Sequence, residues 1–287
     1  MAEPMIEYRD EIAGHITRVL EIEGDGPPLL LLHGFADSAD TWRMVLDRLS
    51  RTGRRAMAID LPGFGTCTTI DPDAGILEQI DDMVAAATVR LAEEAGQDVV
   101  VAGNSLGGCA SLRAAQNPDL PMVAAAPISP AGLDMPVWFS LIERDPFLRT
   151  VLGSGLPIPP PVTRLAVARL YRTLAFQDTS AIPPQVLSTF AAHLQDRRSV
   201  VRIMSIGKRL LPELRDPFVF EDVRVPVLLV WGDRDRMVTH KGSRHILEAL
   251  PDTRYELIEG CGHCPQLEAP DRVVDALLDF APIPASA

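Results

Sequence analysis

Short runs made entirely of apolar residues recur along this chain, separated by segments with helical periodicity. Residues 29–32 are four consecutive leucines, and residues 227–230 form a second run of the same kind. Strands of a half-exposed sheet alternate apolar with polar residues, whereas strands that helices cover on both faces are apolar throughout. The sequence therefore predicts an α/β fold with a mostly parallel, doubly wound sheet.

The strands of this sheet are predicted at residues 16–22, 29–32, 55–60, 98–103, 122–128, 226–231 and 254–259. Two amphipathic helices are predicted between them, at residues 41–51 and 76–95. In the first helix Trp42, Val45 and Leu49 recur at spacings of three and four, which places them on one face. Helices of this kind bury that face against the sheet.

The alternation of strands and helices is interrupted once. Residues 133–222 show helical periodicity broken by prolines, and no strand-like run. We expect a helical cap, inserted into an α/β core formed by residues 1–132 and 223–287. The chain has 287 residues, 47% of them hydrophobic, which is enough for one large core.

The charge balance limits the partners. Lys and Arg number 27 against 39 Asp and Glu, a net charge of −12, which argues against nucleic acid or an anionic membrane as a partner. No apolar run approaches the roughly 20 residues of a membrane span, and the first residues lack the pattern of a signal peptide. A cytoplasmic protein is expected, and nothing in the sequence assigns an oligomeric state.

The sequence Gly103-Asn104-Ser105-Leu106-Gly107 follows the fourth predicted strand and opens a helix. A serine on so sharp a turn takes a strained positive φ, and the two glycines omit side chains that would clash there. Its hydroxyl is exposed beside a helix N-terminus, whose free N–H groups can stabilise an oxyanion. Ser105 is therefore a candidate nucleophile.

Serine is a weak nucleophile unless a base and a group that orients the base lie nearby. The sixth predicted strand is followed by Asp233 and Asp235, and the seventh by His263. Loops at the carboxyl ends of parallel strands gather at one edge of the sheet, so Ser105, one aspartate and His263 are expected to converge. The order Ser, Asp, His is one of the known triad orders.

Five segments resemble motifs of the α/β-hydrolase superfamily, in the family order, and the resemblance covers nearly the whole chain. They are His33-Gly34-Phe35, Asp60-Leu61-Pro62-Gly63-Phe64-Gly65, Gly103-Asn104-Ser105-Leu106-Gly107-Gly108, Trp231-Gly232-Asp233-Arg234-Asp235 and Gly262-His263-Cys264-Pro265-Gln266-Leu267-Glu268. The resemblance is to the serine-nucleophile, esterase-like and lipase-like branch with a helical cap. It implies the α/β-hydrolase fold.

The resemblance also implies roles for individual residues. Ser105 would be the nucleophile, His263 the general base and then acid, and Asp235 the carboxylate that fixes the histidine tautomer. Asp235 is favoured because the family's acid lies three residues after the glycine, and Asp233 is the second candidate. His33 is expected to shape, through hydrogen bonds, the loop that begins with His33-Gly34-Phe35, the expected oxyanion loop.

The oxyanion donors implied by the family are the backbone N–H groups of Phe35 and Leu106. Candidate pocket residues are aromatic: Trp42 follows the oxyanion loop, and Trp138 and Phe139 lie in the expected cap. Each has an alternative role in packing, since aromatic residues at such positions also form core. The substrate would then be a small molecule held by apolar contacts.

Two cysteines flank the candidate base in Cys261-Gly262-His263-Cys264, a spacing also found in metal sites. A structural zinc site needs about four ligands, and Cys67 and Cys109 supply no second pair. No bound metal and no cofactor is expected, and the four cysteines are predicted to be free thiols.

The serine narrows the chemistry further. Epoxide hydrolases and haloalkane dehalogenases of the superfamily carry aspartate at this point, so Ser105 favours acyl transfer through an acyl-enzyme. The predicted function is hydrolysis of a small to medium, mainly apolar carboxylic ester.

Two alternatives remain. The segment from Gly103 to Gly108, the elbow that carries Ser105, resembles the Gly-Asn-Ser-Met-Gly-Gly of carbon–carbon bond hydrolases that act on 2-hydroxy-6-oxo-dienoates. It departs from them at two positions: Leu106 replaces the methionine, and Cys264 follows the histidine where those enzymes often have tryptophan. A slow-turnover ligand-binding or signalling protein would share the same fold and triad. An acyl acceptor other than water is also compatible with this sequence.

Overall fold

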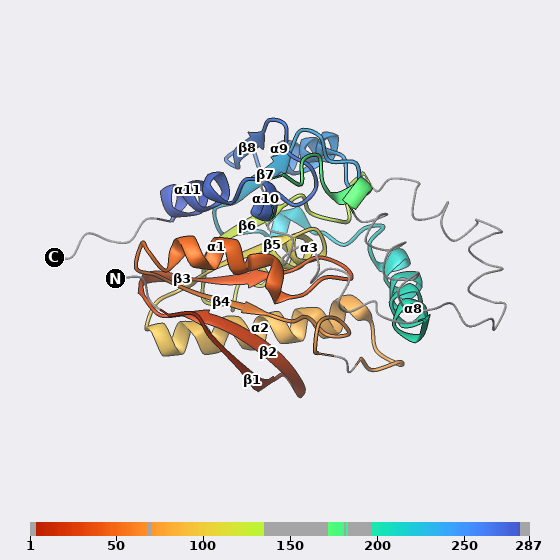
Figure 1. Ribbon diagram of the computed structural model, residues 1–287, viewed down its shortest axis with the longest axis horizontal. Helices are drawn as coiled ribbons and strands as arrows, with labels where there is room; N and C mark the ends of the chain where they lie inside the picture. The colour runs from red at the N-terminus through yellow and green to blue at the C-terminus, as the bar shows by residue number, and fades with distance from the viewer. Residues whose placement is uncertain (1–3, 68–69, 135–171, 181, 183–196, 282–287) are drawn as a thin grey trace.

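The computed structural model describes residues 4–67, 70–134, 172–180, 182 and 197–281, and Figure 1 shows their arrangement. Eight strands form one sheet in the order β1-β2-β4-β3-β5-β6-β7-β8. Their bounds are β1 Ile6–Ile12, β2 His15–Ile22, β3 Asp25–Leu32, β4 Arg54–Ile59, β5 Val99–Asn104, β6 Met122–Ile128, β7 Leu228–Gly232 and β8 Arg254–Ile258.

The sheet is parallel from β4 to β8 and antiparallel only where β2 pairs with β1 and β4. All seven predicted strands are present, and the predicted α/β class is confirmed. The sequence prediction misses β1, a largely exposed edge strand in which four of the seven residues are charged. A tight turn joins it to β2 at Ala13 and Gly14, whose φ angles are 49° and 77°.

Helices cover both faces of the sheet. The α-helices whose bounds lie within the described residues are α1 Arg43–Leu49, α2 Ile76–Ala95, α3 Leu106–Ala114, α8 Arg197–Glu213, α9 Ser243–Ala249, α10 Pro265–Glu268 and α11 Pro270–Phe280, with 3-10 turns η1 Ala39–Trp42, η2 Phe220–Asp222 and η3 His240–Gly242. Helices α1 and α11 pack against each other over one face, and α2 and α3 pack over the other (Figure 1). Within the described residues no helix combines the length and apolar character of a membrane span.

The four leucines of β3 explain why its sequence is uniformly apolar. Leu29 and Leu31 join the core cluster on the α1 and α11 side, whereas Leu30 and Leu32 join the cluster on the α2 and α3 side. All four are fully buried. Successive side chains of a strand point to opposite faces, so a strand between two helical layers needs apolar residues at every position.

Helix α8 lies within the predicted cap and is anchored to the core by polar contacts. Arg202 donates to the Gly63 carbonyl at 2.8 Å, and the Glu213 carboxylate accepts from the N–H groups of Ile76 and Leu77 at 3.0 and 2.7 Å. Glu213 thereby satisfies two of the free N-terminal donors of α2. Of the predicted cap, residues 135–171, 181 and 183–196 lie outside the described residues.

Candidate active site

Ser105 occupies a strained turn between β5 and α3. Its φ and ψ are 55° and −110°, a conformation that costs a non-glycine residue about 1–3 kcal/mol. A Cβ at Gly103 would overlap the backbone of Gly107, and one at Gly107 would overlap the Leu32 carbonyl. The two glycines of the motif are therefore required by the close approach of helix and strand. Ser105 is 9% exposed.

His263 and Asp235 form a buried pair on the loops after β8 and β7. His263 Nδ1 lies 2.7 Å from Asp235 Oδ2, and neither side chain is more than 2% exposed. Asp235 also accepts from the N–H groups of Met237 and Val238 at 2.8 and 2.9 Å and from Trp231 Nε1 at 3.1 Å. Because a carboxylate can only accept, this contact is donated by Nδ1–H, and Nε2 is the ring nitrogen that Asp235 does not engage.

Asp233, the second sequence candidate, faces elsewhere. Its carboxylate accepts from the Cys261 N–H at 3.3 Å and pairs with Arg234 at 3.2 Å. Of the two aspartates, the structure brings Asp235 to His263.

Asn104, which sequence reasoning did not single out, connects the elbow to the histidine loop. Its Nδ2 donates to the His263 carbonyl at 2.9 Å and to the Ile128 carbonyl at 3.3 Å. The Asn104 side chain is buried. Thus the residue before the candidate nucleophile holds the backbone of the candidate base.

The loop after β3 approaches Ser105 from the other side. A Cβ at Gly34 would stand 3.3 Å from the Ser105 Cβ, so only glycine fits without displacement. The buried His33 ring donates from Nδ1 to the Gly34 carbonyl at 2.7 Å and accepts from the Leu61 N–H at Nε2, at 2.9 Å. These hydrogen bonds fix the loop that carries the Phe35 N–H, as expected for a structural histidine.

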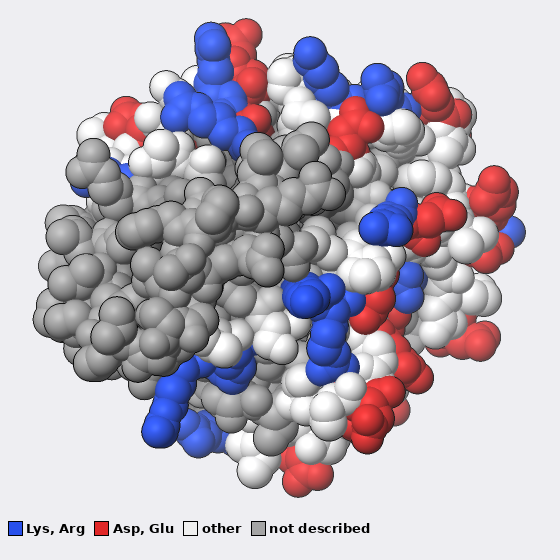
Figure 2. All heavy atoms as spheres, turned by 90° about the vertical axis from the view of Figure 1, so that its right-hand side faces the viewer, with Lys and Arg blue, Asp and Glu red and all other residues white. Residues whose placement is uncertain are grey.

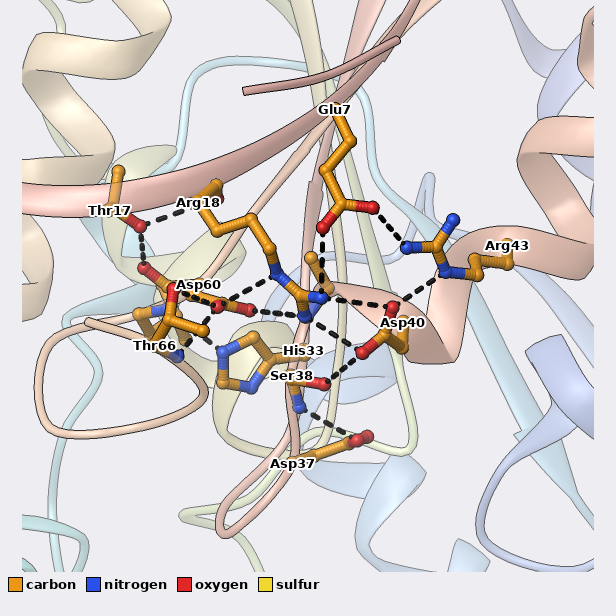
Figure 3. A network of polar contacts seen from close by, with 12 residues as sticks. Glu7, Thr17, Arg18, His33, Asp37, Ser38, Asp40, Arg43, Asp60 and Thr66 are labelled. Atoms are coloured by element: carbon orange, nitrogen blue, oxygen red, sulfur yellow. Dashed lines mark hydrogen bonds and ion pairs between the residues drawn. The ribbon is translucent and has the colours of Figure 1, made fainter. Parts of the chain in front are cut away.

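A buried polar network supports the same loop (Figure 3). Arg18 of β2 donates to Asp60 at 3.2 Å and to Asp40 at 2.9 Å. Asp60 in turn accepts from the N–H groups of Ala39 and Thr66, both at 2.8 Å. The network therefore joins the end of the loop after β3, the candidate oxyanion loop, to the loop that follows β4.

A pocket opens over Ser105. Its described lining is Phe35, Ser105, Leu106, Ala131, Gly207, Leu210, Leu211, Leu214, Met237 and Val238. Residues on α8 form one wall, and loops after β3, β5, β6 and β7 form the rest. Among these residues only Ser105 is polar.

The sequence-predicted pocket aromatics lie elsewhere or outside the described residues. Trp42 is fully buried in the core with α1 and is not part of the described pocket lining, which supports its packing alternative. Trp138 and Phe139 fall outside the described residues.

The cysteines beside the histidine are buried free thiols, as are Cys67 and Cys109. Burial raises the pKa of the Cys261 and Cys264 thiols, and neighbouring carboxylates add to the effect. Both therefore stay protonated near neutral pH, a form that is neither nucleophilic nor metal-binding.

The face that carries α8 has mixed charge. Figure 2 shows Lys and Arg side chains interspersed with Asp and Glu on this face, and no continuous basic tract crosses its described part. The described lining of the pocket is itself apolar apart from Ser105.

Comparison with known proteins agrees with this architecture. The model of the Alpha/beta hydrolase family matches residues 29–276. The 2-hydroxy-6-oxo-6-(2'-aminophenyl)hexa-2,4-dienoic acid hydrolase of Metapseudomonas resinovorans is 27% identical, over 92% of this chain and 87% of its own. Lipase 3 of Moraxella sp. (strain TA144) is 26% identical, over 85% and 74%.

Among solved structures, a membrane phospholipase A described as a novel bacterial virulence factor superimposes with a TM-score of 0.75. It is 23% identical and the match covers 96% of this chain and 85% of that one. At this identity the likeness concerns the fold. With the family model spanning most of the sequence, the chain belongs to the alpha/beta hydrolase family and is a hydrolase.

Proposed function

We propose that this protein hydrolyses small to medium, mainly apolar carboxylic esters through an acyl-enzyme on Ser105. The observation that carries the proposal is the buried pair of His263 Nδ1 and Asp235 Oδ2 at 2.7 Å, close in the fold to a strained serine that opens onto an apolar pocket. Asn104 links the two, since it precedes Ser105 and binds the His263 carbonyl.

In the first half of the reaction, Ser105 Oγ attacks the ester carbonyl while His263 Nε2 takes the hydroxyl proton. The tetrahedral intermediate collapses as His263 returns that proton to the departing alcohol. In the second half, His263 takes a proton from the water that attacks the acyl-enzyme carbonyl. It then returns this proton to Ser105 Oγ as the acyl–Oγ bond breaks, which releases the acid and restores the free serine. Asp235 stays ionised and stabilises the imidazolium.

The negative charge of each intermediate would lie on the carbonyl oxygen, between the N–H groups of Phe35 and Leu106. Leu106 is the first residue of α3, so its N–H has no partner within the helix and carries the positive end of the helix dipole. The Phe35 N–H lies on the loop that approaches Ser105 at Gly34. Each donor of this type contributes about 2.7–4 kcal/mol to transition-state stability.

The test uses p-nitrophenyl acetate, butyrate and octanoate with wild type and Ser105→Ala. The substitution is expected to lower kcat by roughly 10³-fold or more without loss of folding. A fluorophosphonate probe, followed by peptide mapping, should label Ser105. Comparable rates for the two proteins, or labelling at another serine, would contradict the proposal.

A carbon–carbon bond hydrolase is the second candidate, favoured by the Metapseudomonas relative and by the Gly103-to-Gly108 elbow. Its dienoate substrate carries a carboxylate, which needs a cation or several donors when buried. The described pocket lining contains no cation, which favours an apolar ester. Turnover of a 2-hydroxy-6-oxo-dienoate at a higher kcat/KM than any p-nitrophenyl ester would reverse this order.

A further inference from the structure

We propose that Glu268 is a positioning residue for His263 and that it couples the histidine loop to residues 173–178 of the predicted cap. The inference deepens the proposed function and rests on it for the role of His263. Glu268 ends α10, five positions after His263, and is half-buried. Its side chain does not line the described pocket.

Glu268 accepts hydrogen bonds from two separate segments. Its Oε1 accepts from the Gly262 N–H at 2.9 Å, directly before His263. Its Oε2 accepts from the N–H groups of Gln177 and Asp178, each at 2.9 Å. One carboxylate therefore joins the loop of the candidate base to a segment about 90 residues earlier in the chain.

The same segment also contacts His263 directly. The Ala175 carbonyl accepts from the His263 N–H at 2.8 Å. A Cβ at Gly262 would lie 2.6 Å from Glu268 Oε1, 2.7 Å from the Ala175 carbonyl oxygen and 2.8 Å from the Gln177 nitrogen. The three groups thus meet at Gly262, a position that only glycine can occupy without displacement.

Apolar packing ties the segment to the core at this point. Ala175 and Phe176 are buried with Cys264 and Leu267 in a small cluster of their own, which also includes Ile182. The segment is therefore packed beneath the histidine loop, and the hydrogen bonds act within a fixed local structure.

Arg236, next to Asp235, makes a second connection to the segment. Its guanidinium donates to the Thr173 carbonyl at 3.2 Å and to Gln177 Oε1 at 2.7 Å. The loops of the candidate acid and of the candidate base are thus both bound to residues 173–178. A displacement of this segment would move the partners of His263 on both sides.

A carboxylate suits this position because all three partners are N–H donors. A glutamine would keep one acceptor oxygen and would turn its NH2 group toward at least one donor, which breaks the connection on that side. A displacement of a general base by about 1 Å can lower the rate of the chemical step roughly 10²-fold. Substrate affinity should change little, since the pocket is untouched.

The test compares Glu268→Gln with Glu259→Gln, a matched control that neutralises an exposed carboxylate near the same loop. For Glu268→Gln we expect kcat on p-nitrophenyl butyrate to fall about 10- to 100-fold with KM within about 2-fold. Hydrogen–deuterium exchange should speed up together in residues 173–178 and 260–264. The control should alter neither the kinetics nor the exchange.

The outcomes separate this inference from the proposed function. An active wild type in which Glu268→Gln leaves kcat and exchange unchanged, or raises KM alone, overturns the role of Glu268. A wild type that cleaves no ester contradicts the proposed function, while coupled exchange of the two segments still tests the connection. If Glu268→Gln does not fold, Arg236→Met should speed exchange in residues 173–178 and lower kcat, and no change in either overturns the coupling.

Discussion

The side chain of Asn104 donates a hydrogen bond to the backbone carbonyl of His263 at 2.9 Å, across 159 residues of sequence. The same amide nitrogen lies 3.3 Å from the Ile128 carbonyl oxygen at the end of β6. Asn104 is buried, so water cannot easily replace its side chain as the donor to these carbonyls. One side chain therefore holds the elbow and the histidine loop in a fixed relative position.

Substitution Asn104→Ala should destabilise the protein and slow catalysis. It removes the side-chain donor from the buried His263 carbonyl, an unpaired state that costs about 1–3 kcal/mol, whereas the Ile128 carbonyl keeps the Ser105 N–H as a donor at 2.9 Å. Urea unfolding should report this loss, and kcat on p-nitrophenyl butyrate should fall because His263 loses its anchor. Asn104→Asp should be worse, since a carboxylate oxygen would face both carbonyls. An Ala variant with wild-type kcat would show that the anchor is not required.

Asp235→Asn should lower kcat by about 10⁴-fold, with far less effect on KM. An amide can turn its NH2 group toward Nδ1, whereas a carboxylate can only accept from it. The substitution therefore no longer favours the tautomer with the proton on Nδ1 and an unprotonated Nε2. Asp233→Asn is the matched control, because Asp233 lies two residues away and contacts Cys261 and Arg234 instead. Equal losses in the two variants would refute the assignment of Asp235.

The sequence predicts the parts of the site that depend on local geometry. Gly103 and Gly107 are visible as a motif because backbone atoms fill the space where their Cβ atoms would stand. The uniform apolar character of β3 reveals the two helical layers. The loops that carry Ser105, Asp235 and His263 follow strands, and parallel strands end at one edge.

Other features depend on contacts that leave no periodic signal. Asn104 and Glu268 act on backbone N–H and carbonyl groups far away in the chain, and any residue supplies such groups. The edge strand β1 has a polar sequence because much of it is exposed to solvent, so it lacks the apolar run that marks the other strands. Trp42 belongs to the apolar face of an amphipathic segment. This sequence pattern is the same whether the tryptophan packs in the core or contacts a substrate.

Acid should weaken the polar network that supports the candidate oxyanion loop. Burial raises the pKa of Asp40, but hydrogen bonds from Arg18 and Arg43 lower it by more, and its pKa lies below the usual value. A carboxyl with a depressed folded-state pKa stabilises the fold above its unfolded pKa of about 3.9 and loses that contribution as pH falls through the folded value. Its stabilisation is therefore present at pH 7 and declines below about pH 4.

The variant Asp40→Asn tests this sign. The free energy of unfolding should fall by about 1–3 kcal/mol at pH 7, and the difference from wild type should shrink toward pH 3. Arg18 keeps its contact with Asp60, which limits the loss. Asp47→Asn removes an exposed carboxylate paired with Arg51 and should change stability little at either pH. A difference that stays constant from pH 7 to pH 3 would contradict the linkage.

Gly207 should set the length of acyl chain that the pocket accepts. It lines the pocket from the middle of α8, and Leu210, Leu211 and Leu214 follow at helical spacings of three, four and seven on the same wall. A side chain at Gly207 would therefore project toward the space above Ser105. Gly207→Ala and Gly207→Val should progressively fill it.

The measurement is the ratio of kcat/KM for p-nitrophenyl octanoate to that for acetate. Each added methyl group should lower this ratio by about 10-fold or more, because one methylene of misfit in an apolar pocket is worth about 1–3 kcal/mol. Lys208→Ala, on the exposed side of the same turn, is the control and should leave the ratio unchanged. If Gly207→Val lowers the rates for acetate and octanoate equally, the residue affects α8 as a whole and does not select chain length.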